Sequence, residues 1–254
     1  MNTETFRTRL KRGDRLIGTI ISLAAPEVVE IVAAAGFDWL FLEAEHAPLS
    51  PLDLQRLIIA AHGLPCVVRL PNHDEIQIKR ALDAGAAGII VPQVNTAEQA
   101  RAVVARAKFP PQGSRGVGVA RANSYGYAVA DYVARANEES AVIVQAEHIE
   151  AVGNLAQIAA VPGVDAIFVG PYDLSASMGK LGQLGDPEVV AAIAKVAKVT
   201  LAAGLKLGFF AMSAELVAPQ MASGFTLIAC GVDTVFLAQR ARETLLTLRA
   251  APAR

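Results

Sequence analysis

Short apolar segments alternate with amphipathic ones along almost the whole chain. The apolar segments are continuous rather than interrupted at every second residue, which is typical of parallel strands buried on both faces. We predict strands at 16–22, 37–43, 65–69, 88–91, 141–146, 165–169, 206–210 and 225–229. Each is followed by a helical pattern, at 26–35, 51–62, 74–84, 95–108, 149–160, 187–203, 213–221 and 232–248.

Residues typical of helix ends support these boundaries. Pro26 and Pro187 stand at helix starts, where the missing N–H of proline costs no hydrogen bond. Asn95 is a candidate cap for the helix that follows it, and Gly36 ends the helix before the second strand. Two longer segments, 110–137 and 170–186, interrupt the alternation and are predicted as loops.

Repetition of strand and helix indicates an α/β protein. Eight such units within 254 residues are expected of a (β/α)₈ TIM barrel, here one domain spanning 1–254. The alternative is a doubly wound open sheet, in which a nucleotide-binding glycine motif commonly follows the first strand. That turn reads LAAPEV and lacks the motif, so the barrel is favoured.

Composition removes several classes of protein. The chain is 53% hydrophobic with a formal net charge of -1, which excludes a disordered chain and gives no basic footprint for nucleic acid. No apolar run reaches the ~18 residues of a membrane span, and the start MNTETFRTRLKRGDR has no apolar core of a secretory signal. Cys66 and Cys230 form neither a disulfide framework nor a zinc motif, so we expect buried thiols and a cytoplasmic protein.

Polar residues gather where the predicted strands end, which is the functional rim of a barrel. Side chains alternate across a strand, so Glu43 and Glu45 share one face and can both point to the barrel axis. The polar residues at strand ends are Glu43, Glu45, His46, Arg69, Gln93, Gln145, Glu147, His148, Tyr172 and Asp173.

These residue types favour chemistry with a divalent cation. Carboxylates from different strands can hold Mg²⁺ through one or two protein ligands and leave positions for substrate. Arg69 would then be a fixed cation for a carboxylate or an enolate oxygen, and His46 is the natural proton carrier. The alternative is that the carboxylates only form structural ion pairs with Arg69.

The positions of the lysines argue against a Schiff-base mechanism. Lys206 falls at the start of the seventh strand, which is the opposite rim of the barrel. The other lysines fall in predicted helices, in a loop or before the barrel: Lys11, Lys79, Lys108, Lys180, Lys195 and Lys198. Two histidines, His62 and His73, are expected on the surface without function, and His148 is expected to point outward.

At these residues the sequence resembles the HpcH/HpaI family of metal-dependent, class II pyruvate aldolases. The resemblance covers nearly the whole chain and keeps the same order of motifs. The segments that carry it are EAEHAP (43–48), VRLP (68–71), IKRALDAGAAGIIVPQVNTAEQA (78–100), RGVGVARA (115–122), QAEHIEAV (145–152) and VDAIFVGPYDLSASMG (164–179).

The resemblance implies a carbon–carbon lyase that adds pyruvate reversibly to an aldehyde, giving a 4-hydroxy-2-oxo acid. It implies Mg²⁺ or Mn²⁺, with Co²⁺ as a third candidate, and no organic cofactor. It also implies hexamers built as trimers of dimers, in which the C-terminal helix at 232–248 is exchanged between subunits. The matching residues are Glu147 and Asp173 as metal ligands, Arg69 at the keto oxygen, His46 as acid and base, the N–H groups of Tyr172 and Asp173 at the pyruvate carboxylate and Gln145 near the site. For Glu45 two roles stay open, support of metal-bound water and structural anchoring.

One position departs from the family pattern. The family usually has Asp-x-Glu-His where this chain has Glu43-Ala44-Glu45-His46, and the aspartate orients the histidine. Glu43 keeps the charge and adds a methylene, which changes the geometry of that pair. This departure leaves open a non-catalytic barrel that binds a keto acid. A second alternative, independent of Glu43, is an acyl-CoA lyase of the citrate-lyase type, although the chain has no extension or basic cluster that would suit CoA. The identity of the aldehyde is not specified by the sequence.

Overall fold

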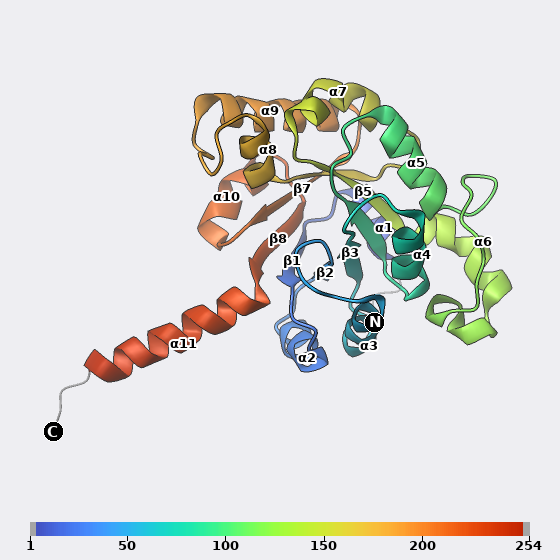
Figure 1. Ribbon diagram of the computed structural model, residues 1–254, viewed down its shortest axis with the longest axis horizontal. Coiled ribbons are helices and arrows are strands. Elements are labelled where there is room, and N and C mark those ends of the chain that lie inside the picture. Colours follow the sequence, from blue (N-terminus) through green and yellow to red (C-terminus); the bar gives the residue numbers. More distant parts are fainter. Residues whose placement is uncertain (1–3, 251–254) are drawn as a thin grey trace.

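Eight parallel strands pair in sequence order and close into a barrel, which confirms the predicted fold (Figure 1). The computed structural model describes residues 4–250. The last strand pairs with the first, with Leu16 opposite Leu227, so no open sheet edge remains in the barrel. The strands are β1 (Leu16–Ile21), β2 (Trp39–Glu43), β3 (Cys66–Arg69), β4 (Gly88–Val91), β5 (Ala141–Ala146), β6 (Ala166–Val169), β7 (Lys206–Ala211) and β8 (Leu227–Val232).

All eight predicted helices are present. Of the further helical segments, one precedes the first strand and the others begin within the stretches predicted as loops. Thr96, rather than Asn95, caps the helix after β4, because its hydroxyl accepts the N–H of Gln99 at 3.2 Å. The predicted helices are α2 (Pro26–Ala34), α3 (Pro51–Ala60), α4 (Glu75–Asp83), α5 (Ala97–Ala107), α7 (Ile149–Ala159), α9 (Pro187–Ala202), α10 (Ala214–Ala222) and α11 (Asp233–Ala250). The others are α1 (Phe6–Arg12), the 3₁₀ segment η1 (Arg121–Gly126), α6 (Val129–Glu139) and α8 (Pro171–Ser177). Among these described helices, none combines the length and apolarity that crossing a membrane requires.

Two apolar clusters stabilise the barrel. One lies between the strands and the surrounding helices, and the other fills the interior with residues of one strand face. Trp39 and Phe41 belong to the interior cluster, and the Trp39 ring leaves no space for a side chain at Gly18, where a Cβ would lie 2.6 Å from it. Phe6 and Leu10 of α1 join this cluster, so α1 closes the N-terminal end of the barrel.

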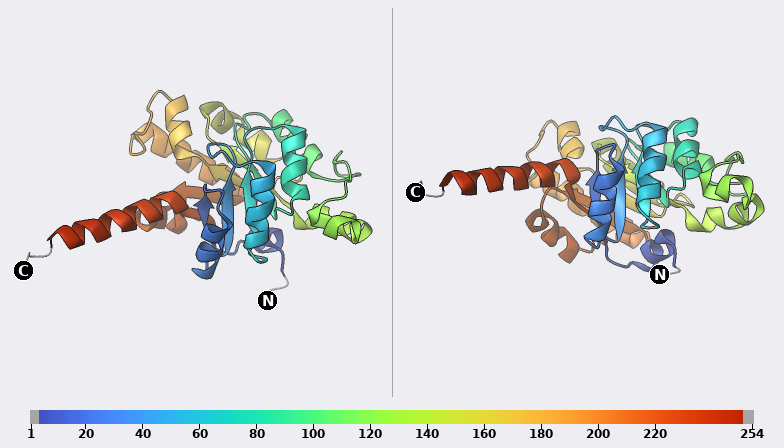
Figure 2. Two further views of the ribbon diagram at one scale, coloured as in Figure 1. Left: turned by 60° about the horizontal axis from the view of Figure 1, so that its bottom comes forward. Right: turned by 90° about the horizontal axis from the view of Figure 1, so that it is seen from below.

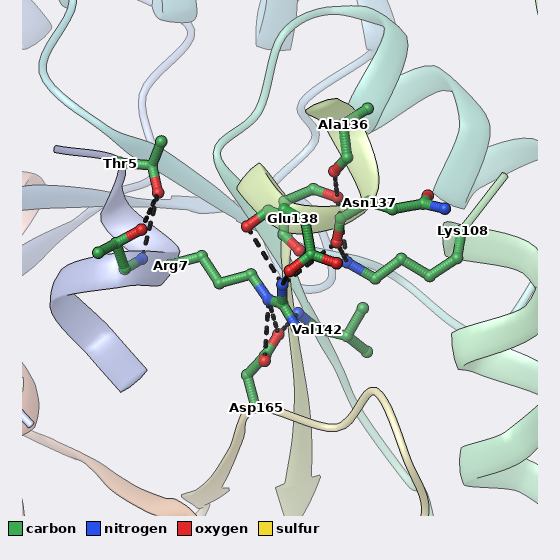
Figure 3. Close-up of polar contacts among 10 residues, drawn as sticks. Thr5, Arg7, Lys108, Ala136, Asn137, Glu138, Val142 and Asp165 are labelled. Atoms are coloured by element: carbon green, nitrogen blue, oxygen red, sulfur yellow. Dashed lines mark hydrogen bonds and ion pairs between the residues drawn. The ribbon is translucent and has the colours of Figure 1, made fainter. Parts of the chain in front are cut away.

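A buried polar cluster fastens α6 to that closed end (Figure 3). The Arg7 Nε atom donates to both carboxylate oxygens of Asp165 at 2.9 Å, and Asp165 also accepts the N–H of Val142. Lys108 is fully buried and donates to the carbonyl oxygens of Asn137 and Ser140 at 2.8 and 2.6 Å. Burial lowers the pKa of Lys108 to about 8. Arg7 Nη1 also donates to the carbonyl oxygens of Asn137 and Glu138, so both cations bind the C-terminal end of α6, which is the negative end of a helix.

The last helix, α11, extends away from the barrel in every view (Figures 1 and 2). Its first residue, Asp233, is buried and accepts four hydrogen bonds, from both N–H and hydroxyl of Ser22 and from the N–H groups of Leu23 and Thr234. These bonds fix the start of the helix on the loop after β1. From Leu237 onward its residues are exposed, including Leu245 and Leu248.

Candidate active site

The predicted functional residues converge at the C-terminal ends of the strands, around a cavity of about 150 Å³. Phe41 and Phe168, which belong to the interior cluster, also line this cavity, as expected for every second residue along a strand. A larger hollow of about 630 Å³ lies at the opposite end, beside η1 and α6, and the strand-end carboxylates do not line it. The small cavity is lined by Ile20, Phe41, His46, Arg69, Gln145, Phe168, Val169, Gly170, Pro171, Tyr172, Asp173 and Phe210.

Arg69 is held in place by two carboxylates from the end of β2. Its Nε atom donates to Glu43 Oε2 at 2.7 Å and lies 3.3 Å from Glu45 Oε2, and its Nη2 atom pairs with Glu43 as well. The guanidinium carbon lies 5.4 Å from the centroid of the Phe41 ring, so the cation also makes a cation–π contact. These contacts fix a guanidinium at the floor of the cavity, where it can stabilise a developing anion.

Glu43 accepts hydrogen bonds from the backbone of the segment that carries His46. Its Oε1 atom accepts the N–H groups of Glu45 and His46 at 2.7 and 3.0 Å, while its Oε2 atom is bound to Arg69. The carboxylate facing the imidazole is that of Glu45, whose Oε2 atom lies 3.8 Å from His46 Nε2. The side chain of His46 is 68% exposed, so the imidazole can exchange protons with solvent.

Glu147 is the most strongly perturbed carboxylate of the site. It is buried at the end of β5, and this burial raises its pKa to about 7, with Glu45 and Asp173 adding repulsion. Its Oε1 atom accepts the N–H of Gln93 at 2.7 Å, and its Oε2 atom is in close contact with the Gln145 amide. A buried acid with a raised pKa beside other carboxylates is the expected state of a metal ligand in the absence of its cation.

Gly170 leaves room for this carboxylate. A Cβ at that position would lie 3.0 Å from Glu147 Oε2 and 2.9 Å from Glu147 Cβ. Directly after Gly170, the short helix α8 begins at Pro171 and places Tyr172 and Asp173 in its exposed first turn at the mouth of the cavity.

Glu45 also has a perturbed carboxyl group. Its burial raises its pKa, as do the charges of Glu43 and Asp173, while the charge of Arg69 lowers it. The carboxylates therefore form one interacting group.

The donor set fits a hard divalent cation. Glu147 and Asp173 supply carboxylate oxygens, and the Gln145 Oε1 atom is buried without a hydrogen-bond partner beside them. Within residues 4–250, no group of three or more acidic, histidine or cysteine side chains is placed to hold a metal ion, so the protein itself offers at most two such ligands here. Mg²⁺ commonly binds one or two protein carboxylates and keeps its other positions for water and substrate. Open positions are needed for chemistry on a bound keto acid.

One contribution to the site could not be anticipated from the sequence. Gln93 was identified as a strand-end residue, but it acts through its backbone N–H, which no residue pattern reveals. His73, which was expected at the surface, is half-buried, and its Nε2 atom donates to the carbonyl oxygen of Pro92 at 2.5 Å, directly before Gln93. The predicted rim position of Lys206 agrees with the structure, where it begins β7 and lies beside Gly13 at the closed end.

Comparisons with known proteins agree with this geometry. The family model described as HpcH/HpaI aldolase/citrate lyase matches residues 17–239. The chain is 46% identical over 238 residues to a hydroxypyruvate/pyruvate aldolase of Chromohalobacter salexigens, covering 92% of this chain and 93% of the relative. A 4-hydroxy-2-oxovalerate aldolase of Novosphingobium aromaticivorans is 37% identical, with 95% and 93% of the two chains covered. A crystal structure of a Burkholderia cenocepacia HpcH/HpaI aldolase/citrate lyase family protein superposes with a TM-score of 0.92 at 36% identity, covering 96% of this chain and 98% of that one.

Proposed function

The chain belongs to the HpcH/HpaI aldolase/citrate lyase family, and we propose that it is a class II aldolase adding the enolate of pyruvate reversibly to an aldehyde. One observation carries the proposal: Glu147, buried with a raised pKa, and Asp173 interact at the same rim as the fixed guanidinium of Arg69. The family and its aldolase relatives support a lyase. They favour this reaction over an acyl-CoA lyase of the citrate-lyase type.

Glu147 and Asp173 hold the divalent metal, Mg²⁺ or Mn²⁺, which supplies Lewis-acid stabilisation of negative charge on the keto oxygen of pyruvate. Arg69 donates to the same oxygen from the position fixed by Glu43. His46, with Glu45 beside it, takes a proton from the methyl group, and the resulting enolate carbon forms the new bond to the aldehyde carbon. His46 then returns this proton to the aldehyde oxygen, which becomes the 4-hydroxyl group. Gln145 and the N–H groups of Tyr172 and Asp173 orient the carboxylate of pyruvate.

Exchange of the methyl protons of pyruvate with solvent tests this proposal without an assumed aldehyde. In D₂O, the enzyme with added Mn²⁺ is expected to introduce deuterium into pyruvate, because removal of the methyl proton is reversible. The same enzyme treated with EDTA is expected to lose this exchange, and added Mn²⁺ to restore it. Proton NMR of the methyl signal measures the rate. Hydroxypyruvate, which appears in the names of several relatives, serves as a second donor.

Exchange that persists in EDTA would contradict the metal role, and no exchange under any condition would favour a non-catalytic barrel that binds the keto acid. A panel of aldehydes, from glyceraldehyde to succinate semialdehyde, then identifies the acceptor through consumption of pyruvate. The aldehyde that gives the largest kcat/KM defines the substrate class.

We also propose that the protein assembles as a homohexamer, a trimer of dimers in which the two subunits of each dimer exchange α11, in a cytoplasmic setting. The support for exchange is the direction of α11 and its exposed leucines, since Leu237, Leu245 and Leu248 recur at helical spacing along one face. The support for a reducing compartment is the pair of free thiols, Cys66 and Cys230.

The double substitution Leu245→Glu and Leu248→Glu is expected to reduce the assembly to smaller species. Both side chains are exposed in the single chain, where such changes alter stability by only about 0.5 kcal/mol. In an exchanged dimer they would place charges in an apolar contact. Light scattering coupled to size-exclusion chromatography measures the mass, and six copies of the 26.6 kDa chain are expected for the wild type. Gln239→Glu, elsewhere on α11, is the matched control, and an unchanged mass in the double variant would contradict the exchange.

A further inference from the structure

A single peptide group links a histidine outside the cavity to the buried carboxylate of Glu147. The carbonyl oxygen of Pro92 accepts a hydrogen bond from His73 Nε2 at 2.5 Å. The N–H of Gln93, on the other side of the same peptide bond, donates to Glu147 Oε1 at 2.7 Å. The imidazole, the peptide group and the carboxylate therefore form one continuous chain of hydrogen bonds.

The backbone of Gln93 is held in an unfavourable conformation at this point. Its φ angle is +52°, in the left-handed region of backbone conformation that residues other than glycine rarely adopt. The side chain is exposed, so burial of the glutamine does not account for the conformation. Strained backbone persists where the surrounding structure holds it, and such positions are concentrated at functional sites. Here the strained residue is the one whose N–H binds Glu147.

Contacts from two neighbouring elements hold the loop between β4 and α5, and a third contact holds one of those elements. His73, in the loop between β3 and α4, binds the Pro92 carbonyl, and the carbonyl of His73 itself accepts Arg106 Nη1 of α5 at 2.7 Å. On the other side, Asn154 Nδ2 of α7 donates to the carbonyl of Asn95 at 2.9 Å. The peptide that carries the Gln93 N–H is thus fixed before and after the strained residue.

The bond from His73 has only one direction. A carbonyl oxygen carries no proton, so Nε2 of His73 must be the donor, both in the neutral imidazole with that tautomer and in the imidazolium. A donor at the carbonyl polarises the peptide and strengthens the hydrogen bond that its N–H makes in turn. His73 thereby acts on Glu147 without touching it.

We propose that His73 is a positioning residue for the metal-binding carboxylate. By fixing the Pro92–Gln93 peptide, it holds Glu147 Oε1 and sets the orientation in which the carboxylate meets the cation. Partners of this kind, which orient a ligand from behind, commonly affect metal affinity or activity by about 10- to 100-fold. The proposal rests on the proposed function, because it takes Glu147 as a ligand of the metal.

Affinity for Mn²⁺, measured from the EPR signal of the free ion during titration of the metal-free protein, tests this role without an activity assay. His73→Ala is expected to weaken Mn²⁺ binding by about tenfold or more. His73→Gln is expected to stay within about threefold of the wild type, because its amide N–H can reach the same carbonyl. His62→Ala is the matched control, since His62 is exposed and pairs with Glu30 on the outer helices.

Thermal unfolding in EDTA shows that each variant is folded, and His73→Asn, with a shorter amide side chain, replaces His73→Ala if that variant does not fold. Affinity of His73→Ala equal to that of His62→Ala would overturn the proposal. So would an equal loss in His73→Ala and His73→Gln, because a donor to Pro92 would then be irrelevant. Failure of the wild type to bind Mn²⁺ would contradict the metal role of Glu147, and the positioning role with it.

Discussion

Replacing Glu147 with glutamine is expected to reduce deuterium exchange into pyruvate at least about a thousandfold and, at the same time, to stabilise the metal-free protein at pH 8. The first effect follows from loss of a metal ligand, since metal stabilisation of the enolate is worth several kcal/mol and each 1.36 kcal/mol is a factor of ten in rate. The second follows from the raised pKa of the carboxyl group. A change that abolishes activity and adds stability identifies a residue retained for function.

The sign of the stability effect follows from where Glu147 takes up its proton. Burial raises the pKa in the folded protein to about 7, from 4.5 in an exposed chain. Between these values the folded state binds the proton and the unfolded state does not, so the contribution to stability is complete below about pH 4.5 and is lost as the pH rises through 7. At pH 8 the ionised carboxylate therefore destabilises the metal-free protein, by up to about 3 kcal/mol. Glutamine carries no charge, and the unpartnered Gln145 Oε1 can accept its amide after rotation of the Gln145 amide.

Thermal unfolding in EDTA at pH 5 and pH 8 measures this effect. The variant is expected to unfold at a higher temperature than the wild type at pH 8, with the difference much reduced at pH 5. Glu150→Gln is the control, because Glu150 is an exposed carboxylate at the start of α7 and its removal should change neither activity nor the pH dependence. A variant less stable than the wild type at pH 8 would contradict the assigned cause of the raised pKa.

Arg7→Met is expected to lower the free energy of unfolding by about 3–5 kcal/mol. Its guanidinium binds both oxygens of the buried Asp165, and its removal leaves a buried carboxylate without its cation. The carbonyls of Asn137 and Glu138 lose a donor as well, which loosens the end of α6. Urea denaturation followed by circular dichroism measures the change.

Arg12→Met on the same helix is the control for this prediction. Arg12 pairs with Glu4 and Asp14 at the surface, where ion pairs contribute about 1 kcal/mol or less. A second substitution, Asp165→Asn, is expected to recover part of the loss in the Arg7→Met background, because it removes the unpaired charge. Equal losses in Arg7→Met and Arg12→Met would show that the buried pair contributes no more than a surface pair.

The barrel could be predicted from the sequence because eight short, continuous apolar segments alternate with amphipathic segments of helical length. The alternation of side chains along a strand predicted that Glu43, Arg69 and Gln145 face the interior. They share strand parity with Phe41, Val67 and Ile143, which belong to the interior cluster. The helices α6 and α8 were not predicted, because glycines and prolines near them are typical of loops. Their ends are fixed instead by tertiary contacts, such as those of Lys108 with the last turn of α6.

The site could be predicted only as far as side chains determine it. The convergence of strand-end carboxylates follows from the topology of a parallel barrel. The hydrogen bonds of Glu43 to the main chain beneath His46 depend on the backbone path of the loop after β2, which the sequence does not specify. The contact between His73 and Pro92 joins two loops that are 19 residues apart, and no local pattern encodes it.

Trp39 gives this fold an internal optical reporter at its point of closure. It is the only tryptophan of the chain, it is fully buried, and its indole N–H lies 3.2 Å from the carbonyl oxygens of both Leu16 and Ile228. Those carbonyls belong to β1 and β8, which are the first and last strands. Indole fluorescence of this protein therefore comes from the seam where the two ends of the barrel meet. A red shift of the emission therefore marks the separation of β1 from β8, independently of how much helical structure remains around the barrel.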